Sequence, residues 1–161
     1  MPAVWRLTKT RYVSSAWDGE AARRLGGRWN SVGTAVVYTS ATLALALVET
    51  LVHLPSDVLP AFTAIPVEFD EFDDAMVTSL AGKDLPDDWR VTAPPSSTMA
   101  IGDRWVESGR SLALKVPSVV VPTEFNYVLN PAHADFGRLR VGTPAPFPFD
   151  ERLLRDAPKG D

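Results

Sequence analysis

Residues 26–54 read GGRWNSVGTAVVYTSATLALALVETLVHL, and this stretch concentrates the chemistry of the chain. Two glycines free the backbone in front of Arg28. The β-branched run at 35–39, which contains Tyr38, predicts a strand. An apolar segment with one carboxylate, Glu49, follows. We therefore expect a cation, a phenol and an acid to meet at one site.

The apolar segment predicts a helix. Ser40 is a favourable N-cap, and Pro55 disfavours helical geometry in the residue before it, so the helix is expected from about Ala41 to about His53. At roughly 100° per residue, its leucines and valines cover more than half of the circumference. Such a helix is expected to be buried on most sides. Glu49 and His53 lie on the narrow polar stripe that remains.

The carboxylate on this helix is the first candidate for a catalytic group. A buried carboxylate must face a cleft, pair with a cation or lose its charge. The alternative is that Glu49 and His53 form only the solvent-exposed edge of an amphipathic helix. The sequence of the helix alone leaves both interpretations open.

Composition narrows the class of protein. The chain has 161 residues, 45% of them hydrophobic, which favours a single domain with one core. A net charge of -4 offers no basic surface for nucleic acid, which disfavours a ribonuclease. Cysteine is absent, which excludes disulfides and thiolate nucleophiles. Residues 1–15 do not form a signal peptide and no apolar run could span a membrane, so we expect a cytoplasmic protein without membrane contact.

The remaining elements were predicted from periodicity and turn residues. Strands are expected at 3–8, 62–69, 111–121 with a break at Pro117-Ser118, and 138–142. Helices are expected at 75–80 and at 98–108, and loops at 18–27, 85–97 and 122–131. Pro66 predicts an edge or a bulge in its strand. The polar loop at 122–131 lies beside a strand, a common place for function.

The order of these elements predicts an α+β fold. No internal repeat and no strict βαβ alternation is present, which favours a mixed or antiparallel sheet with a few helices. We expect a single compact domain over residues 1–154. Its proline-rich end carries Phe147, Phe149 and Leu153, which are available to pack on the body. Residues 155–161 are expected to be frayed.

Several familiar sites do not fit the sequence. The glycines of residues 26–33 do not match the dinucleotide-fold pattern. Glu49 and His53 lie four residues apart, but the chain has only two histidines and no third ligand at zinc spacing, so no metal is expected. Ser118 lacks the flanking glycines of a serine-hydrolase elbow.

One reaction suits an arginine, a tyrosine and a single carboxylate. Arginine grips phosphate with two parallel hydrogen bonds, and tyrosine can stack on a flat ring. Cleavage of the nicotinamide–ribose bond of NAD releases a leaving group that is already cationic, so the acid partner of ordinary glycoside hydrolysis is dispensable. One carboxylate then suffices to stabilise the positive charge at the anomeric carbon.

Seven short motifs follow one another along nearly the whole chain. They are Trp5-Arg6, Gly26-Gly27-Arg28-Trp29-Asn30, Val36-Val37-Tyr38, Leu47-Val48-Glu49-Thr50-Leu51-Val52-His53-Leu54, Val116-Pro117-Ser118, Asn126-Tyr127 with Asn130-Pro131, and Phe149-Asp150 with Arg152-Leu153. With these motifs in this order, the chain resembles the RES-domain toxins of Xre–RES toxin–antitoxin modules, a family named for an arginine, a glutamate and a serine. Each motif is weak alone, and together they are specific.

The resemblance implies a fold similar to ADP-ribosyltransferases and a toxin that consumes cellular NAD. It also implies a cognate Xre-type antitoxin that blocks the NAD pocket, with a homodimer as one possible arrangement in the complex. By the match, Arg28 binds the NAD phosphates, Tyr38 stacks near the nicotinamide and Glu49 is the catalytic carboxylate. The further pocket candidates are Ser118, Asn126, Arg6 and His53.

Structural alternatives stay open for these residues. Arg28 could form only a salt bridge, Tyr38 could be a core aromatic, and a serine after proline is often a turn residue. His53 could hydrogen-bond one helical turn from Glu49. Trp29 and Trp105 are expected to pack in the core.

The acceptor of the ADP-ribose also stays open, because loop shape determines it. Water or inorganic phosphate would make the protein an NAD glycohydrolase or an NAD phosphorylase. A protein acceptor would make it an ADP-ribosyltransferase. A non-catalytic interaction module, with Glu49 in a structural role, is the alternative from another class.

Overall fold

A computed structural model describes residues 3–54, 59–71 and 73–154, so Pro55 and the expected frayed tail at 155–161 lie outside the described residues. The strands are β1 Ala3–Lys9, β2 Val37–Ser40, β3 Phe62–Glu68, β4 Val77–Ser79, β5 Ala113–Pro117, β6 Phe125–Leu129, β7 Arg140–Val141 and β8 Ala145–Phe147. The α-helices are α1 Glu20–Leu25, α2 Leu43–Leu51 and α3 Ser96–Ser108. Short 3-10 turns lie at η1 Thr10–Ser15, η2 Gly82–Asp84, η3 Phe136–Arg138 and η4 Glu151–Leu154.

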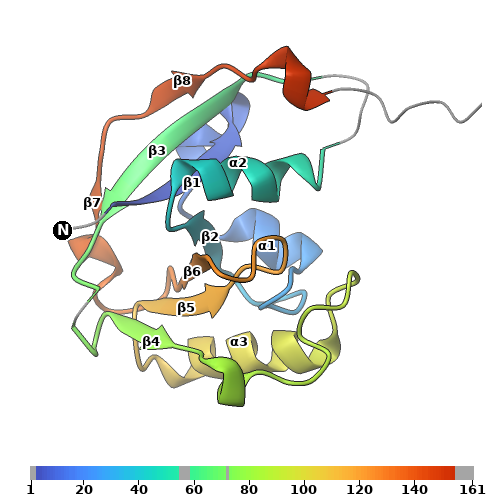
Figure 1. The fold of residues 1–161 in the computed structure, drawn as a ribbon. Helices are drawn as coiled ribbons and strands as arrows, with labels where there is room; N and C mark the ends of the chain where they lie inside the picture. Colours follow the sequence, from blue (N-terminus) through green and yellow to red (C-terminus); the bar gives the residue numbers. More distant parts are fainter. Residues whose placement is uncertain (1–2, 55–58, 72, 155–161) are drawn as a thin grey trace, which may run out of the picture.

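One mixed sheet organises the fold. Its strand order is β4-β5-β6-β2-β1-β3-β7, and β8 also pairs with β3. Only β4 and β5 run parallel among these pairs. Figure 1 shows the sheet as two halves, with β1, β3, β7 and β8 above and β2, β6, β5 and β4 below. The two halves meet where Trp5 of β1 is in register with Ser40 of β2. The predicted α+β fold with a mixed sheet is confirmed.

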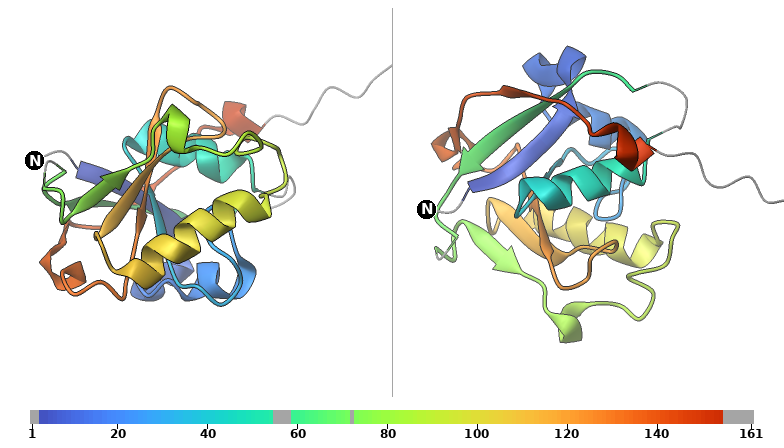
Figure 2. Two further views of the ribbon diagram at one scale, coloured as in Figure 1. Left: turned by 90° about the horizontal axis from the view of Figure 1, so that it is seen from below. Right: turned by 45° about the horizontal axis from the view of Figure 1, so that its top comes forward.

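The strands of the lower half bury apolar side chains on both faces. On one face, Trp29, Val36 and Trp105 pack with a set of strand residues beneath α3: Leu114, Val116 and Val128. The other face contributes Val37, Leu112, Ala113, Tyr127 and Leu129 to a cluster with Val4, Val67, Phe69 and Met76. The left panel of Figure 2 shows α3 lying across the lower strands. Both tryptophans therefore have the packing role that the sequence predicted.

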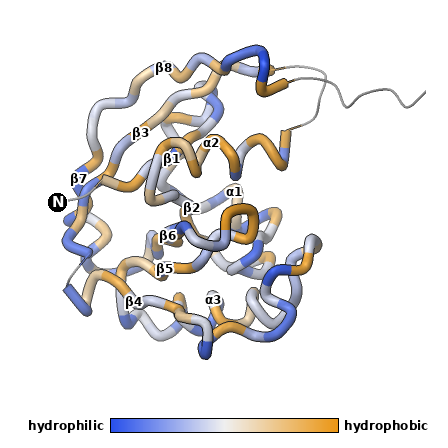
Figure 3. The backbone as a smooth tube through the Cα atoms, viewed as in Figure 1, coloured by the Kyte–Doolittle hydropathy of each residue, from blue (hydrophilic) through white to orange (hydrophobic). Residues whose placement is uncertain are grey.

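Helix α2 lies against β1 and β2 and carries Glu49. Figure 3 shows it as largely hydrophobic. Its N-cap is Thr42, whose hydroxyl accepts a hydrogen bond from the Leu45 amide at 3.1 Å, and the helix ends at Leu51, so the predicted start and end were each about two residues too far out. The expected burial on most sides is met only in part: Leu45 and Ala46 are buried, Ala44 is exposed, and the other residues of α2 are half-buried.

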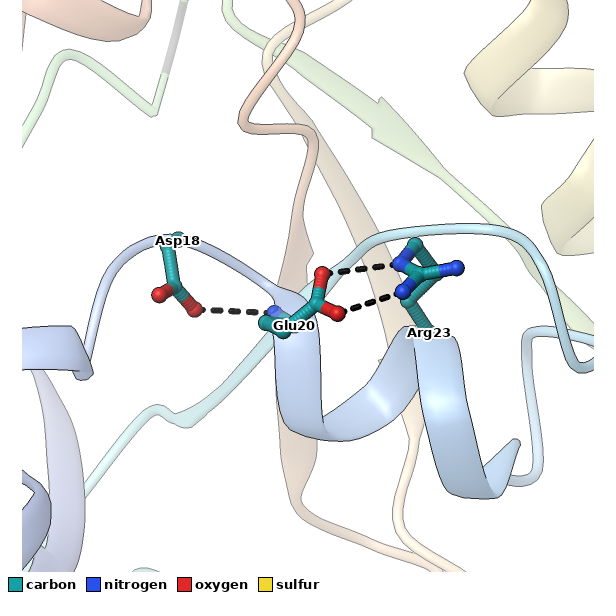
Figure 4. A network of polar contacts seen from close by, with 3 residues as sticks. All are labelled: Asp18, Glu20 and Arg23. Carbon is teal, nitrogen blue, oxygen red and sulfur yellow. Dashed lines mark hydrogen bonds and ion pairs between the residues drawn. The ribbon is translucent and has the colours of Figure 1, made fainter.

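Helix α1 replaces part of the loop predicted at 18–27. The Asp18 carboxylate accepts a hydrogen bond from the Glu20 amide at 2.8 Å, just before the first turn. Glu20 then pairs with Arg23 one turn later (Figure 4), an i,i+3 pair that favours a helix. These local polar contacts stabilise a helix too short for its apolar periodicity to predict.

Two further elements differ from the predictions, and sheet pairing explains both. Residues 75–80 form no helix, because β4 pairs in parallel with β5 and its β-branched Val77 and Thr78 suit a strand. Residues 125–129 of the predicted polar loop form β6, which lies between β2 and β5. Pairing on both sides outweighed the turn-prone composition of that segment.

The C-terminal part closes over β3. Pro66 is not on an edge strand: β1 pairs with β3 on one side, and on the other β8 covers 62–64 and β7 covers 67–68, leaving Pro66 in the gap between them. The register shifts by one residue across this gap, as in a bulge, so the predicted irregularity lies opposite Pro66. A proline, which has no N–H to donate, fits this gap.

Phe149 packs edge-on against Phe62, as expected, with ring centres 4.9 Å apart. Leu153 remains 46% exposed. No helix of the described residues has the length and apolar character needed to cross a membrane.

Candidate functional site

The Glu49 carboxylate is held by two side chains from the sheet. Its Oε1 accepts a hydrogen bond from the Ser118 hydroxyl at 2.6 Å and from the Asn126 amide at 2.8 Å. Among the described residues, no other hydrogen bond to this carboxylate is present, so its Oε2 accepts none from them. The helix supplies the acid, and the ends of β5 and β6 fix its orientation.

Ser118 follows β5 and is fully buried. Its hydroxyl oxygen accepts hydrogen bonds from the backbone amides of Val120 at 3.1 Å and Val121 at 3.0 Å. Because a hydroxyl has one proton and two lone pairs, these amides leave its proton committed to Glu49. Ser118 thus closes a turn and also donates to the carboxylate.

Asn126 belongs to β6 and faces the same side of the sheet as Tyr38. Its Nδ2 donates to Glu49, and its Oδ1 accepts a hydrogen bond from the Ser40 hydroxyl at 2.7 Å. Ser40 is directly opposite Asn126 in the β2–β6 register. A chain of hydrogen bonds therefore runs from β2 through β6 to the carboxylate of α2.

Tyr38 is anchored to the loop that carries Arg28. Its hydroxyl donates to Asn30 Oδ1 at 2.6 Å and accepts from the Trp29 amide at 3.0 Å. Burial raises the pKa of Tyr38 well above its ordinary value. A Cβ on Gly27 would lie 2.6 Å from this hydroxyl, so only glycine fits there. The phenol is thus engaged within the fold, and its half-buried ring packs against the cluster around Trp29 and Trp105.

Arg28 lies between α1 and β2, and its side chain contacts a loop that is distant in the sequence. Its Nη atoms donate to the carbonyls of Trp89 at 3.2 Å, Val91 at 2.6 Å and Thr92 at 3.1 Å. Partial burial lowers the pKa of Arg28, and the negative charge of Glu49 opposes this shift. A guanidinium has five N–H donors, and these bonds use three of them.

The structure therefore brings together Glu49, Ser118 and Asn126 by direct contact, with Arg28 and Tyr38 nearby. Arg6 is placed differently. Its guanidinium donates to the Ala16 carbonyl at 3.0 Å and to the Tyr38 carbonyl at 3.1 Å, and burial lowers its pKa. It ties β1 to η1 and to the strand that carries Tyr38.

His53 lies beyond the end of α2 and is exposed. Both hydrogen bonds to Glu49 come from elsewhere, so the alternative of a bond from His53 is not realised among the described residues. Two surface hollows are present elsewhere, and none of the candidate site residues lines them. Residues 77–80 and Arg110 line the first hollow, and Arg138 and Arg140 line the second. No cluster of three or more potential metal ligands occurs in the described ranges.

Sequence reasoning did not identify three parts of this site. Ser40 was assigned to the helix N-cap, although its hydroxyl bonds to Asn126. Asn30 is fully buried and joins Tyr38 to the carbonyls of Ala22 and Thr34. The loop at 89–92 contacts Arg28 from more than sixty residues away, about which local sequence gives no signal. Ser40 could have been found only from the register between β2 and β6, which places it opposite Asn126.

Comparisons with known proteins agree on one family. The sequence matches the RES domain over residues 3–150. It is 41% identical to "Toxin Res" of Yersinia enterocolitica over 152 residues, covering 93% of this chain and 98% of the relative. It is 36% identical to "Prs ADP-ribosylating toxin" of Sphingobium sp. over 159 residues, covering 96% and 98%.

A solved structure shares the fold. The M. tuberculosis MbcT–MbcA toxin–antitoxin complex contains a chain that superposes with a TM-score of 0.73 at 17% identity, covering 90% of this chain and 83% of that one. This similarity supports the fold, and the sequence matches extend it to the family. By a match over nearly its whole length, and by relatives that are toxins, this chain belongs to the RES-domain family.

Proposed function

We propose that the protein is a toxin that cleaves the nicotinamide–ribose bond of NAD, with Glu49 as the catalytic carboxylate. The observation that carries this proposal is the carboxylate itself: Oε1 is fixed by Ser118 and Asn126, and Oε2 accepts no hydrogen bond from the described residues. We propose that Oε2 faces the ligand. Groups that are held in place before the reaction stabilise a developing charge most effectively.

The proposed chemistry needs one acid residue. The bond between the ribose carbon and the nicotinamide nitrogen breaks, and its electron pair returns to the ring, which leaves as neutral nicotinamide. The ribose carries the positive charge in the transition state, and the Glu49 carboxylate stabilises it. A water oxygen then bonds to the anomeric carbon and loses a proton, giving ADP-ribose. Attack by inorganic phosphate gives ADP-ribose-1''-phosphate instead.

Arg28 and Tyr38 are proposed to bind the rest of the NAD molecule. The donors that Arg28 does not spend on the loop at 89–92 suit the pyrophosphate. The Tyr38 ring would stack near the nicotinamide, since its hydroxyl is already bonded to Asn30 and Trp29. Arg6 and His53 remain outer candidates for the same pocket.

A second candidate keeps the same bond cleavage and passes ADP-ribose to a protein. The Sphingobium relative is named an ADP-ribosylating toxin, which favours this possibility. We also propose a cognate antitoxin partner of the Xre type, since the structural neighbour is a toxin–antitoxin complex. A homodimer within such a complex and a cytoplasmic location complete the proposal.

The test is a product assay on the purified protein. It is incubated with NAD, with and without phosphate, and the products are identified by mass spectrometry. Nicotinamide with ADP-ribose indicates hydrolysis, and ADP-ribose-1''-phosphate indicates phosphorolysis. Mass added to the protein or to lysate proteins indicates transfer.

Two matched variants make the assay specific. Glu49→Gln should lower turnover by something like 10²–10³-fold, the scale for one transition-state group. Glu71→Gln is the control, because Glu71 also accepts a hydrogen bond from a hydroxyl, that of Tyr127 at 3.1 Å, away from the Glu49 group. Folded wild-type protein that leaves NAD intact, or Glu49→Gln with full activity, would contradict the proposal.

A further inference from the structure

Ser40 occupies a position that the proposed reaction does not yet explain. It ends β2, is 5% exposed, and is directly opposite Asn126 in the antiparallel β2–β6 pair. Side chains at such opposed positions are close enough to bond to each other. The Ser40 hydroxyl donates to Asn126 Oδ1 at 2.7 Å.

The two ends of the Asn126 amide have opposite roles. Oδ1 accepts from Ser40, and Nδ2 donates to Glu49 Oε1 at 2.8 Å. If the amide rotated by half a turn, Oδ1 would face the carboxylate oxygen and two acceptors would oppose each other. A hydroxyl that donates to Oδ1 favours the observed orientation and limits rotation of the amide.

We infer that Ser40 is a positioning residue for Glu49: it holds the Asn126 amide with its N–H directed at the carboxylate. Ser40 does not touch the carboxylate, so it acts through Asn126. The catalytic part of this inference rests on the proposed function, whereas the orientation of the amide does not. Ser118 fixes the same carboxylate oxygen from β5, and Ser40 completes the support from β2.

Removal of this hydroxyl should affect turnover and leave substrate affinity unchanged. Ser40→Ala should lower kcat about 3- to 10-fold, the range for one neutral hydrogen bond. KM should stay within about twofold of wild type, because Ser40 makes no proposed contact with NAD. In the Asn126→Ala background, Ser40→Ala should cause no further loss, because the amide through which it acts is absent.

A matched control separates positioning from stability. The neighbouring Thr39 is 3% exposed, faces the other side of β2, and donates from its hydroxyl to the Tyr127 carbonyl at 2.8 Å. Thr39→Val therefore removes a buried hydroxyl hydrogen bond from the same strand without touching Asn126. It should lower the unfolding midpoint and leave kcat unchanged. Ser40→Thr keeps the hydroxyl and should retain kcat within about twofold.

A second readout does not depend on activity. The side-chain amide protons of Asn126 can be assigned by NMR from their absence in Asn126→Ala. In Ser40→Ala these signals should shift and exchange with solvent about 3- to 10-fold faster, since one of the amide's two hydrogen bonds is lost. In Thr39→Val they should not move.

The outcomes separate the two proposals. Shifted amide signals with a non-additive fall in kcat support the inference. Unmoved amide signals in Ser40→Ala, an equal fall in kcat in Thr39→Val, or a loss that persists in the Asn126→Ala background would overturn it. If wild-type protein does not cleave NAD, the proposed function fails, and the amide signals alone decide whether Ser40 positions Asn126.

Discussion

The Glu49 end and the Arg28 end of the candidate site are held by different kinds of group. Glu49 is held by side chains of Ser118 and Asn126, and both partners sit on or next to paired strands. Arg28 is held by main-chain carbonyls of the loop at 89–92, in a segment without regular structure. Strand-supported sites are more precisely held than loop-supported ones. Under the proposed function, we therefore expect the acid to be fixed before NAD binds, whereas the arginine end adjusts.

The loop also connects the two ends. Arg90, which lies between the residues that contact Arg28, donates from Nε to the Val119 carbonyl at 2.9 Å. Val119 directly follows Ser118. The loop therefore crosses from the arginine to the turn that supports the carboxylate.

The largest effect is expected at the fixed end. Ser118→Ala removes a donor to a carboxylate, a bond worth about 1.5–3 kcal/mol, so kcat should fall about 10- to 100-fold while KM changes little. The variant also deprives the Val120 and Val121 amides of their acceptor, so its unfolding midpoint should fall. Steady-state NAD kinetics at a temperature where the variant remains folded provide the measurement. A change confined to KM would show that Ser118 binds substrate and does not orient the acid.

A smaller effect, of another kind, is expected at the adjustable end. Arg28→Lys keeps the charge and loses the planar fork, so KM should rise about 10-fold with kcat nearly unchanged. The loop at 89–92 should also become more accessible, which hydrogen exchange would detect in that segment. Arg104→Lys, at an exposed position of α3, is the control. An unchanged KM would count against Arg28 as the phosphate ligand.

The same contrast explains what the sequence could predict. At the fixed end, Glu49 stands out on an apolar helix and Ser118 and Asn126 belong to motifs of the family, so these three side chains could be predicted to lie together, whereas Ser40 could not. Even so, Asn126 was expected in a loop and lies in β6. Strand pairing between segments distant in the chain determines that placement, and local composition does not report it.

The adjustable end was predicted less completely. Arg28 was expected to face phosphate, but the carbonyls that hold it come from a segment predicted only as loop. Main-chain acceptors carry no signature in the sequence, since every residue has one. The α1 and β4 errors have the same origin: short elements depend on a few polar contacts or on pairing, and not on a long apolar period.

Tyr38 lies between the two ends, and its hydroxyl is predicted to serve the fold. Tyr38→Phe removes the donor to Asn30 and the acceptor for the Trp29 amide, which should lower the free energy of unfolding by about 1–3 kcal/mol. Because burial raises the pKa of Tyr38, the phenol stays neutral throughout the working range, and the pH profile of kcat should be the same in wild type and variant. Denaturant unfolding and a pH series test both parts. If Tyr38→Phe lost one limb of the wild-type pH profile of kcat, the hydroxyl would be assigned to proton transfer.

The smallest effect is expected on the opposite face of β6, where Tyr127 alternates with Asn126 and points into the core. Burial, with a smaller contribution from Glu71, raises the pKa of Tyr127 to about 12. A phenol whose pKa is higher in the folded state contributes stability in full below its unfolded pKa of about 10, and loses it as the pH rises through the folded value. Stability should therefore fall between these two pH values. Tyr127→Phe should flatten this fall and leave kcat unchanged, and unfolding midpoints at a series of alkaline pH values would measure it. A changed kcat would mean that the two faces of β6 are coupled, and that the fixed end depends on the core beneath it.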